Sequence, residues 1–326
     1  MNQGWTYTDR LTAAAAGQTV LDYYTQRYQH SSRRLWKDRI EQGQILLNGQ
    51  PVSAQTILQS GQHLTYYRLP WQEPIAPLNF EVLYEDDDLW AIAKPSGLPV
   101  LPGGGFLEHT LLHQLRSRYP NKTPVPVHRL GRGTSGVMLV AKSQAAREHL
   151  SRQFRARTAE VEQASVKAER SLPMNLPMNQ LPMEKVYRAL VGPAAVSELG
   201  DHFSCTYPIG KLPYPGLNYL YGHCAGGLPS RSEGQVLDRR VESTLVEVSI
   251  FTGRPHQIRI HLAAAGYPLL GDPLYAAGGI PIVGTTAMPG DCGYHLHAHR
   301  IRFTHPRTGK PVSIVAPLPA ELAINP

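Results

Sequence analysis

The sequence predicts an α+β protein in which a mixed or antiparallel sheet with flanking helices follows a small α/β domain. After Phe80, strand-like segments outnumber helical ones and succeed one another across gaps of hairpin length, which is typical of such a sheet rather than of a doubly wound α/β fold. Three prolines between residues 69 and 79 fix backbone angles and remove hydrogen-bond donors, which favours an extended linker. We therefore expect a small domain over residues 1–68, a linker over 69–79 and a larger domain over 80–326.

The small domain is expected to contain two helices, a hairpin and a further strand. A helical pattern runs from Thr19 to Tyr28, and Ser31-Ser32 can cap a second helix that Gly43 ends. Asn48-Gly49, between apolar runs, is the strongest two-residue signal for a β-hairpin, and residues 64–67 supply another strand.

Three basic residues of the second helix are candidates for RNA binding. Arg33, Arg34 and Lys37 are spaced three to four residues apart or adjacent, so their charges share one side of the helix. An ordinary solvated helix surface has the same spacing, and both interpretations stay open.

The larger domain shows several strand patterns and few helical ones. The expected strands cover residues 80–84, 89–93, 137–141, 185–191, 241–250, 296–303 and 312–315. The expected helices cover residues 109–119, 144–157 and 252–266.

Residues 158–183 interrupt this regular pattern. The segment is polar and then repeats Leu-Pro-Met three times, and prolines at that density exclude a regular helix or a central strand. We expect a mobile insertion, with an ordered lid as the alternative.

The overall charge favours a polyanionic partner. The 326 residues include 32 lysines and arginines against 25 aspartates and glutamates, which gives a net charge of +7, and the isoelectric point is near 9.3. A hydrophobic content of 42% argues against wholesale disorder. Many basic proteins bind no nucleic acid specifically, so composition alone does not identify the partner.

Cysteine usage and the N-terminus indicate a cytoplasmic protein. Cys205, Cys224 and Cys292 are widely spaced and form no Cys-x-x-Cys pair, so we expect no disulfide framework. Neither a signal peptide nor an apolar run long enough to span a bilayer is present, so no membrane association is expected.

The stretch His128 to Gly136 can be interpreted in two incompatible ways. Its glycines satisfy G-x-G-x-x-G, which in a dinucleotide-binding domain must close a strand and open a helix. Here an apolar, strand-like run follows Gly136 and the helical pattern begins only after Ser143. We therefore expect no nucleotide cofactor.

Histidines also invite a metal site. His295, His297 and His299 alternate, which places them on one face of a strand. Zinc sites usually show paired close ligands at recognised intervals, and the remaining histidines and cysteines are scattered across loops. We expect no metal.

Several motifs in register resemble the RluA-type family of RNA pseudouridine synthases across nearly the whole chain. They are Tyr84-Glu-Asp-Asp-Asp-Leu with Lys94-Pro-Ser-Gly, His128-Arg-Leu through Thr134-Ser-Gly, Lys185-x-Tyr187-x-Ala189, Thr252-Gly-Arg-Pro-His-Gln-Ile-Arg259-Ile-His261, and Gly271-Asp-Pro-Leu-Tyr275. Residues 1–68 resemble the small ribosomal-protein-like RNA-binding module that often precedes such catalytic domains.

The resemblance implies isomerisation of uridine to pseudouridine in ribosomal or transfer RNA, without metal or organic cofactor. In this family an aspartate directly after His-Arg-Leu attacks the uridine, and the base is released from C1′, turned and rejoined through C5. Tyr187 would lie against the flipped base. Arg259 would pair with the catalytic carboxylate. The RNA contacts would come from His128, Arg129, Arg132 and Thr134.

The chain departs from this pattern at the nucleophile, because Gly131 stands where the aspartate is expected. Glycine supplies neither nucleophile nor base, so the ordinary covalent mechanism cannot start from this residue. A buried Arg259 without a partner is costly, and three outcomes are open: another carboxylate, from Asp272 or from Asp86–Asp88, an RNA phosphate, or water. For Asp272 alone, a turn-forming role is the expectation.

Two functions follow from these observations. The first is an RNA pseudouridine synthase, with a uridine-sized cavity between Tyr187 and Arg259 onto which Gly131 opens. The alternative is a non-catalytic RNA-binding protein on the same scaffold. The sequence indicates neither the oligomeric state nor the uridine concerned.

Overall fold

The computed structural model describes the chain except residues 122–123, 168–182, 193–198, 216 and 325–326, and for residues 164–167 it describes the backbone alone. The chain forms two compact units, one of Met1–Glu73 with Pro213–Tyr219 and one of Pro74–Leu212 with Leu220–Pro326. Each has its own hydrophobic core. None of the described helices combines the length and the apolar character that crossing a bilayer requires.

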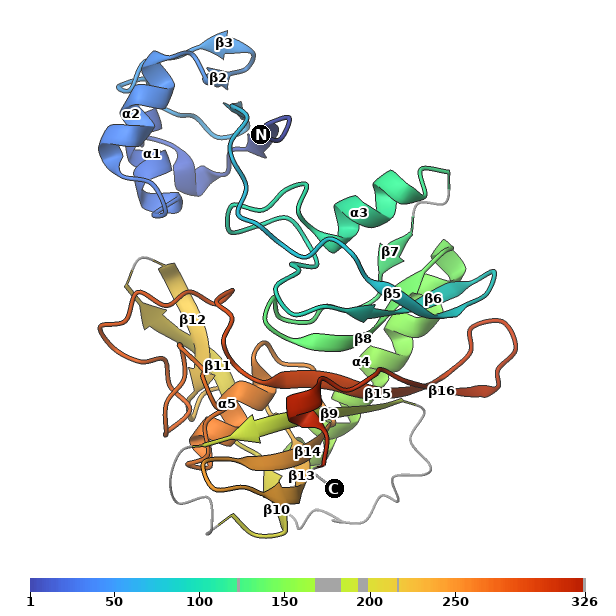
Figure 1. Cartoon of the computed structure of the whole chain (residues 1–326). Coiled ribbons are helices and arrows are strands. Elements are labelled where there is room, and N and C mark those ends of the chain that lie inside the picture. Colours follow the sequence, from blue (N-terminus) through green and yellow to red (C-terminus); the bar gives the residue numbers. More distant parts are fainter. Residues whose placement is uncertain (122–123, 168–182, 193–198, 216, 325–326) are drawn as a thin grey trace. The chain divides into compact units, whose positions relative to one another are not determined.

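The N-terminal unit combines a four-stranded antiparallel sheet, ordered β1-β4-β2-β3, with two helices (Figure 1). Its elements are β1 (Trp5–Arg10), a short 3₁₀ helix (Ala13–Ala15), α1 (Val20–Arg27), α2 (Arg33–Glu41), β2 (Ile45–Leu47), β3 (Gln50–Pro51) and β4 (His63–Arg68). Both expected helices are present, whereas β1 was not expected.

Local sequence signals account for the ends of these elements. Ser32 caps α2, since its side chain accepts a hydrogen bond from the backbone N–H of Leu35. Asn48 and Gly49 both have positive φ angles, of 50° and 80°, as a tight turn between β2 and β3 requires. The expected hairpin is confirmed.

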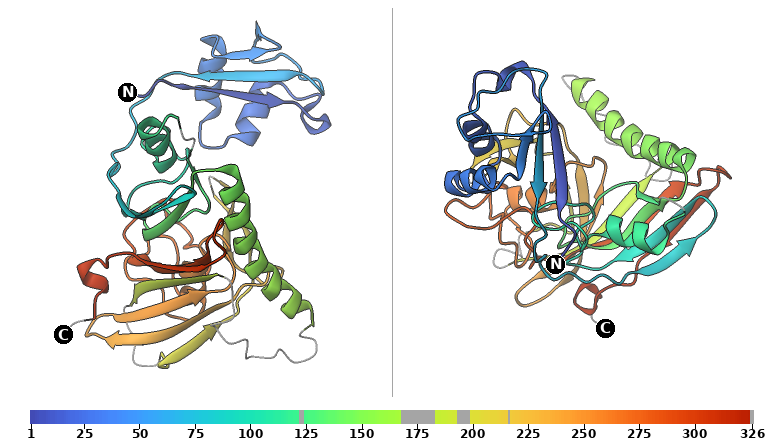
Figure 2. Two further views of the ribbon diagram at one scale, coloured as in Figure 1. Left: turned by 90° about the vertical axis from the view of Figure 1, so that its right-hand side faces the viewer. Right: turned by 90° about the horizontal axis from the view of Figure 1, so that it is seen from above.

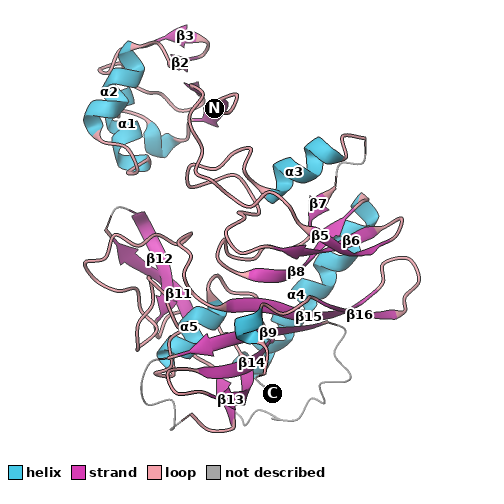
Figure 3. Cartoon of the chain, in the orientation of Figure 1, coloured by secondary structure: helices cyan, strands magenta, loops and turns pink. Residues whose placement is uncertain are grey.

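The larger unit is built on a ten-stranded sheet (Figure 3). Its strands are β5 (Glu81–Glu85), β6 (Leu89–Lys94), β7 (Val125–Pro126), β8 (Ser135–Ala141), β9 (Glu184–Val191), β10 (His202–Cys205), β13 (Ser232–Arg239), β14 (Thr244–Ile250), β15 (Leu296–Thr304) and β16 (Pro311–Val315). Two further strands, β11 (Ile209–Tyr214) and β12 (Leu217–His223), form a separate pair.

The sheet is mixed, as the sequence predicts. Its main path runs β10-β13-β14-β9-β15-β8-β6-β5, with β16 paired to β15 and β7 to β8. β15 and β8 pair in parallel, and the remaining pairings of this sheet are antiparallel. The central strands β6 and β8 are buried nearly throughout, which explains their continuous apolar sequences.

Three helices accompany this sheet: α3 (Leu111–Arg118), α4 (Gln144–Lys167) and α5 (Gln257–Ala264). α4 runs past β8 and β15 on one side of the sheet (Figure 2). The expectation that this helix ends at residue 157 is wrong, because it continues to Lys167 into the segment taken as an insertion. The proline-rich remainder of that segment lies outside the described residues, apart from Met183.

Gly136, the last glycine of the pattern at residues 131–136, has a steric role between two strands. It has φ +110° on β8, and an added Cβ would lie 2.2 Å from the carbonyl oxygen of Ala298 on β15. Glycine is therefore required where two parallel strands meet, and no helix opens here.

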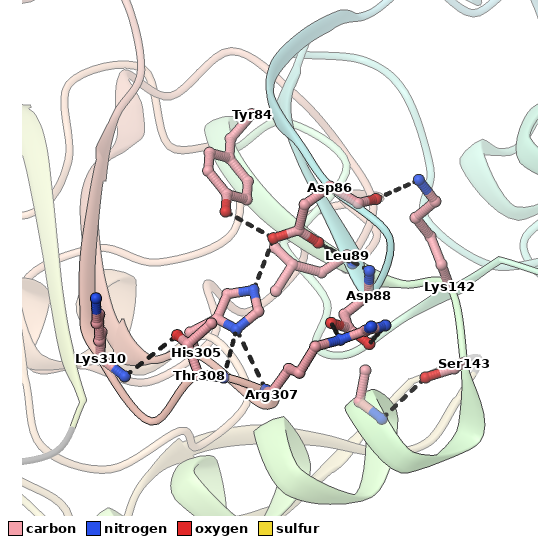
Figure 4. Close-up of polar contacts among 11 residues, drawn as sticks. Tyr84, Asp86, Asp88, Leu89, Lys142, Ser143, His305, Arg307, Thr308 and Lys310 are labelled. Atoms are coloured by element: carbon pink, nitrogen blue, oxygen red, sulfur yellow. Dashed lines mark hydrogen bonds and ion pairs between the residues drawn. The ribbon is translucent and has the colours of Figure 1, made fainter.

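A cluster of polar side chains fastens the turn between β5 and β6 to the turn between β15 and β16 (Figure 4). The carboxylate of Asp86 accepts hydrogen bonds from Tyr84 Oη at 2.6 Å, the N–H groups of Asp88 and Leu89, and His305 Nε2 at 2.6 Å. Arg307 holds Asp88 with two hydrogen bonds. Asp86, Asp88 and His305 come as close as metal ligands would, but their ligand atoms are already engaged with one another and with these donors.

We predict that Asp86→Asn destabilises the protein at neutral pH and roughly half as much at pH 3. Burial opposes ionisation of Asp86, but the hydrogen bonds outweigh it and lower its pKa from 3.8 to about 2. A depressed carboxyl pKa gives stability that is complete above the unfolded value and is lost as the pH falls from about 4 to about 2. With allowance for partial exposure, we expect about 1–2 kcal/mol. Urea unfolding at pH 7 and pH 3 measures the effect.

The exposed neighbour Asp87 provides the control. Asp87→Asn should leave stability unchanged at both pH values. A destabilisation by Asp86→Asn that is equally large at pH 3 would show that the ionised form is not what the cluster stabilises.

Candidate active site

The Lys94-Pro-Ser-Gly motif holds the loop from His128 to Thr134 through hydrogen bonds to its carbonyl groups. Ser96 Oγ donates to the carbonyl of Gly133 at 2.8 Å, and Lys94 Nζ donates to the carbonyl of Arg132 at 3.1 Å. Lys94 is 1% exposed and also donates to two carbonyls of its own turn. Burial lowers the pKa of Lys94 to about 7. The motif therefore positions the loop rather than meeting a ligand.

Arg259 on α5 has a buried carboxylate partner, and that partner is Asp272. Arg259 Nε and Nη2 donate to the two oxygens of Asp272 at 2.7 and 2.6 Å, and the two side chains are 3% and 1% exposed. Asp272 Oδ1 also accepts from the N–H groups of Leu274 and Tyr275. The expectation that Asp272 only forms a turn is therefore wrong: it forms the turn and neutralises the arginine.

Two tyrosine rings flank this ion pair. The guanidinium carbon of Arg259 lies 4.2 Å from the ring centre of Tyr294 and 5.0 Å from that of Tyr275. The third nitrogen, Nη1, is buried and has no hydrogen-bond partner among the described residues. The pair thus leaves one strong donor unused.

Tyr294 also occupies the space beside Gly131. A Cβ added at Gly131 would lie 2.9 Å from Tyr294 Oη, and one at Gly133 would lie 2.9 Å from Tyr294 Cζ. Gly131 itself is exposed, whereas Tyr294 is 5% exposed. Contrary to expectation, the missing side chain at position 131 does not open onto an empty space, because the phenol of Tyr294 borders it.

Tyr187 lies on β9, between Val248 of β14 and Ala298 of β15. It is 8% exposed and belongs to the same packed core as Leu130 and Tyr294. Burial raises the pKa of its phenol. Gly131 and Arg259 thus meet through Tyr294, and Tyr187 belongs to the same hydrophobic core as Tyr294.

The four loop residues expected to contact RNA differ in exposure. Arg129 is exposed, whereas Thr134 is 4% exposed and Arg132 donates to the carbonyl of Gly290. The ring of His128 faces inward: its Nε2 accepts from the N–H of Leu139 at 3.1 Å, and burial lowers its pKa to about 3. Within the described chain, Arg129 is the member of this set best placed to meet a phosphate.

The three basic residues of α2 expected to bind RNA, Arg33, Arg34 and Lys37, are exposed. Arg33 forms an ion pair with Asp22 at 2.6 Å, and Lys37 lies 3.6 Å from Glu41. Such surface pairs contribute little to stability, so these cations remain available, and their role in RNA binding remains a prediction.

His256, just before α5, has a defined protonation state. The hydroxyl of Tyr275 donates its one proton to the carbonyl of Tyr221 at 2.7 Å, so at its 2.8 Å contact with His256 it must accept from Nδ1–H. Burial, reinforced by Arg259, lowers the pKa of His256 to about 3. Its Nε2 is therefore an unprotonated acceptor, on a residue with a φ of 57° that is rare outside glycine.

Sequence reasoning missed Tyr294 altogether. It lies two residues before a strand and belongs to no motif. Gly131 is 163 positions away in the sequence, so no local pattern predicts that the two residues lie close together. Asp272 was considered, but its pairing with Arg259 depends on how α5 meets the turn after Gly271.

We predict that Gly131→Ala destabilises the protein by about 1–3 kcal/mol, the usual cost of overpacking, because the new methyl group meets Tyr294 Oη. In a Tyr294→Phe background, which lacks this oxygen, most of the cost should disappear. Thermal denaturation of the four combinations gives the coupling between the two positions. Gly226→Ala is the matched control, since nothing lies within 4 Å of its added Cβ. Equal effects of the two alanines would contradict the contact.

Comparison with known proteins agrees with these motifs. A family model described as RNA pseudouridylate synthase matches residues 88–264. An uncharacterized RNA pseudouridine synthase of Synechocystis sp. is 49% identical over 93% of this chain and 95% of its own length. RNA pseudouridine synthase 5 of Arabidopsis thaliana is 42% identical over 98% and 94%, and a ribosomal large subunit pseudouridine synthase D of Neisseria meningitidis is 30% identical over 90% and 73%.

Solved structures support the fold. The human RNA pseudouridylate synthase domain containing 1 protein superposes with a TM-score of 0.52 at 23% identity, over 77% of this chain and 89% of that one. With the family model covering more than half of the chain, this protein belongs to the RluA-type family of RNA pseudouridine synthases, which are isomerases.

Proposed function

We propose that this protein isomerises uridine to pseudouridine in structured RNA, ribosomal or transfer RNA, at the site formed by the Gly131 loop, Tyr187 and Arg259. The observation that carries the proposal is Arg259, which is buried, held by Asp272 and left with one donor that has no partner among the described residues. A buried donor without an acceptor is costly, and a ligand that supplies the acceptor would remove that cost.

Product and substrate are isomers, so the reaction consumes no co-substrate and involves no net oxidation or reduction. The C1′–N1 bond breaks with its electrons going to the uracil, the base turns, the C5–C1′ bond forms, and the proton lost from C5 is replaced by one at N1. The departing uracil carries negative charge, which Arg259 Nη1 is suited to stabilise in a water-poor site. Tyr187 would offer its ring face to the base, as its motif implies.

The described carboxylates considered as substitutes for the missing aspartate are poorly suited to attack. Both oxygens of Asp272 are engaged with Arg259, and the side chain is 1% exposed. Asp86–Asp88 precede Leu89, which pairs with Ala141, whereas Lys94 pairs with Gly136 near the loop. Five residues along a strand separate these ends by about 16 Å. Isomerisation by the native chain would therefore use none of these carboxylates as its nucleophile.

A second function is favoured by the Gly131 and Tyr294 arrangement: binding of structured RNA without isomerisation. The phenol of Tyr294 is uncharged, unlike an aspartate, yet it fills the space into which a reactive side chain at position 131 would project. Burial raises the pKa of its phenol, which disfavours the phenolate that could replace a carboxylate.

We predict that the native protein forms pseudouridine at defined positions when incubated with unmodified ribosomal and transfer RNA transcripts, as read by pseudouridine mapping. The double variant Arg259→Met/Asp272→Asn removes both charges while keeping an acceptor for the turn, so it should stay folded and lose product at least a hundredfold, the typical effect of removing one charge-stabilising donor.

A second double variant distinguishes the synthase from the RNA-binding protein. Gly131→Asp combined with Tyr294→Ser supplies a carboxylate and the room for it. Product from this variant but not from the native chain would favour the RNA-binding function, whereas product from the native chain would establish the synthase.

A further inference from the structure

Two buried cations, Arg157 and Lys185, lie near the candidate site, and neither is in a hydrogen bond or ion pair with the described residues. Arg157 on α4 is 2% exposed, and its Nε and Nη1 atoms have no hydrogen-bond partner among the described residues. Lys185 on β9 is 6% exposed, and in the part of the chain that the structure describes no acceptor is bound to its Nζ. Uncompensated buried charges are strongly destabilising, so this pair calls for an anion.

Aromatic rings support the two cations without neutralising them. The guanidinium carbon of Arg157 lies 4.4 Å from the ring centre of Phe251, and Lys185 Nζ lies 5.3 Å from that of Phe154. The charge of Arg157 acts on Lys185, so the two repel each other. Burial and this repulsion lower the pKa of Lys185 to about 8, which leaves the ammonium mainly protonated at pH 7.

The nearby carboxylates are committed to other arginines. Glu184 pairs with Arg300 at 3.2 Å, and Glu233 pairs with Arg231. Glu160 acts on Arg157 over a longer distance, but its own side chain is exposed to water, which screens it. The described surroundings therefore reduce the positive potential without cancelling it.

The pair has an open side at Gly253, the second residue of the Thr252-Gly-Arg-Pro-His motif. Gly253 is exposed, and a Cβ added there would meet only Lys185 Nζ, at 3.9 Å. A ligand on this surface can therefore approach the ammonium group. Lys185 is two residues before Tyr187 on the same strand, so both side chains face the same side of the sheet.

We propose that Lys185, backed by Arg157 and reached past Gly253, binds a backbone phosphate of the RNA close to the target uridine. This inference rests on the proposed function, since it takes RNA as the source of the phosphate. A phosphodiester supplies the missing negative charge and acceptor oxygens, and the low-dielectric surroundings strengthen the attraction.

RNA binding as a function of salt tests the proposal. For the full-length protein and an unmodified transfer or ribosomal RNA transcript, Lys185→Met should reduce the slope of log Kobs against log[KCl] by about 0.7–0.9, the value for one phosphate contact. Lys185→Arg should restore the slope. Lys310→Met, which removes one exposed lysine, is the matched control and should leave the slope as it is.

Inorganic phosphate gives a second readout that is independent of RNA and of turnover. Phosphate should raise the melting temperature of the native protein above that in chloride at equal ionic strength, and by more than it does for Lys185→Met, which keeps only the general salt effect of phosphate. An unchanged salt slope in Lys185→Met would overturn the proposal, even with phosphate protection, because the anion would not be RNA. Loss of slope without pseudouridine formation would uphold the phosphate site while refuting turnover.

Discussion

The buried ion pair of Arg259 and Asp272 is the interaction on which the rest of the site depends. It joins α5 to the turn that follows Gly271, and the carboxylate that neutralises the guanidinium also organises that turn by accepting from Leu274 and Tyr275. Removing one member of such a pair leaves an isolated buried charge, which costs about 3–5 kcal/mol. The guanidinium is therefore fixed before any ligand arrives, and its Nη1 atom, which has no partner in the described part of the chain, is a preorganised donor.

The same pair explains how the chain tolerates glycine at position 131. In the family, an aspartate at this position would share the arginine. Here Asp272 satisfies two of its nitrogens, and the ring of Tyr294 covers it at 4.2 Å. The loop at Gly131 and Gly133 can pass close to Tyr294 only because neither residue has a side chain. Glycine and tyrosine are thus complementary here: the absence of side chains at these two loop positions leaves room for the phenol ring of Tyr294.

Around this centre, the residues divide into those that hold the site and those that can meet RNA. The side chains of Lys94 and Ser96 form hydrogen bonds with the loop, and that of His128 with β8. Arg129 is exposed, and Lys185 borders the open space at Gly253. A rigid buried frame with a few outward cations is an arrangement suited to a flexible polyanion, because phosphate contacts position the RNA.

The sequence by itself determined the fold class, the Asn48-Gly49 hairpin, the buried strand after Gly136 and the family, because each rests on local periodicity, turn chemistry or motif spacing. It did not determine where α4 ends, since polar residues after position 157 continue the helix as readily as they leave it. Only the tertiary structure decided that Asp272 pairs with Arg259, that Tyr294 fills the space at Gly131, and that the charge of Arg157 acts on Lys185. Each of these interactions joins segments distant in sequence, and no local pattern encodes which side chains a folded sheet and its loops bring together.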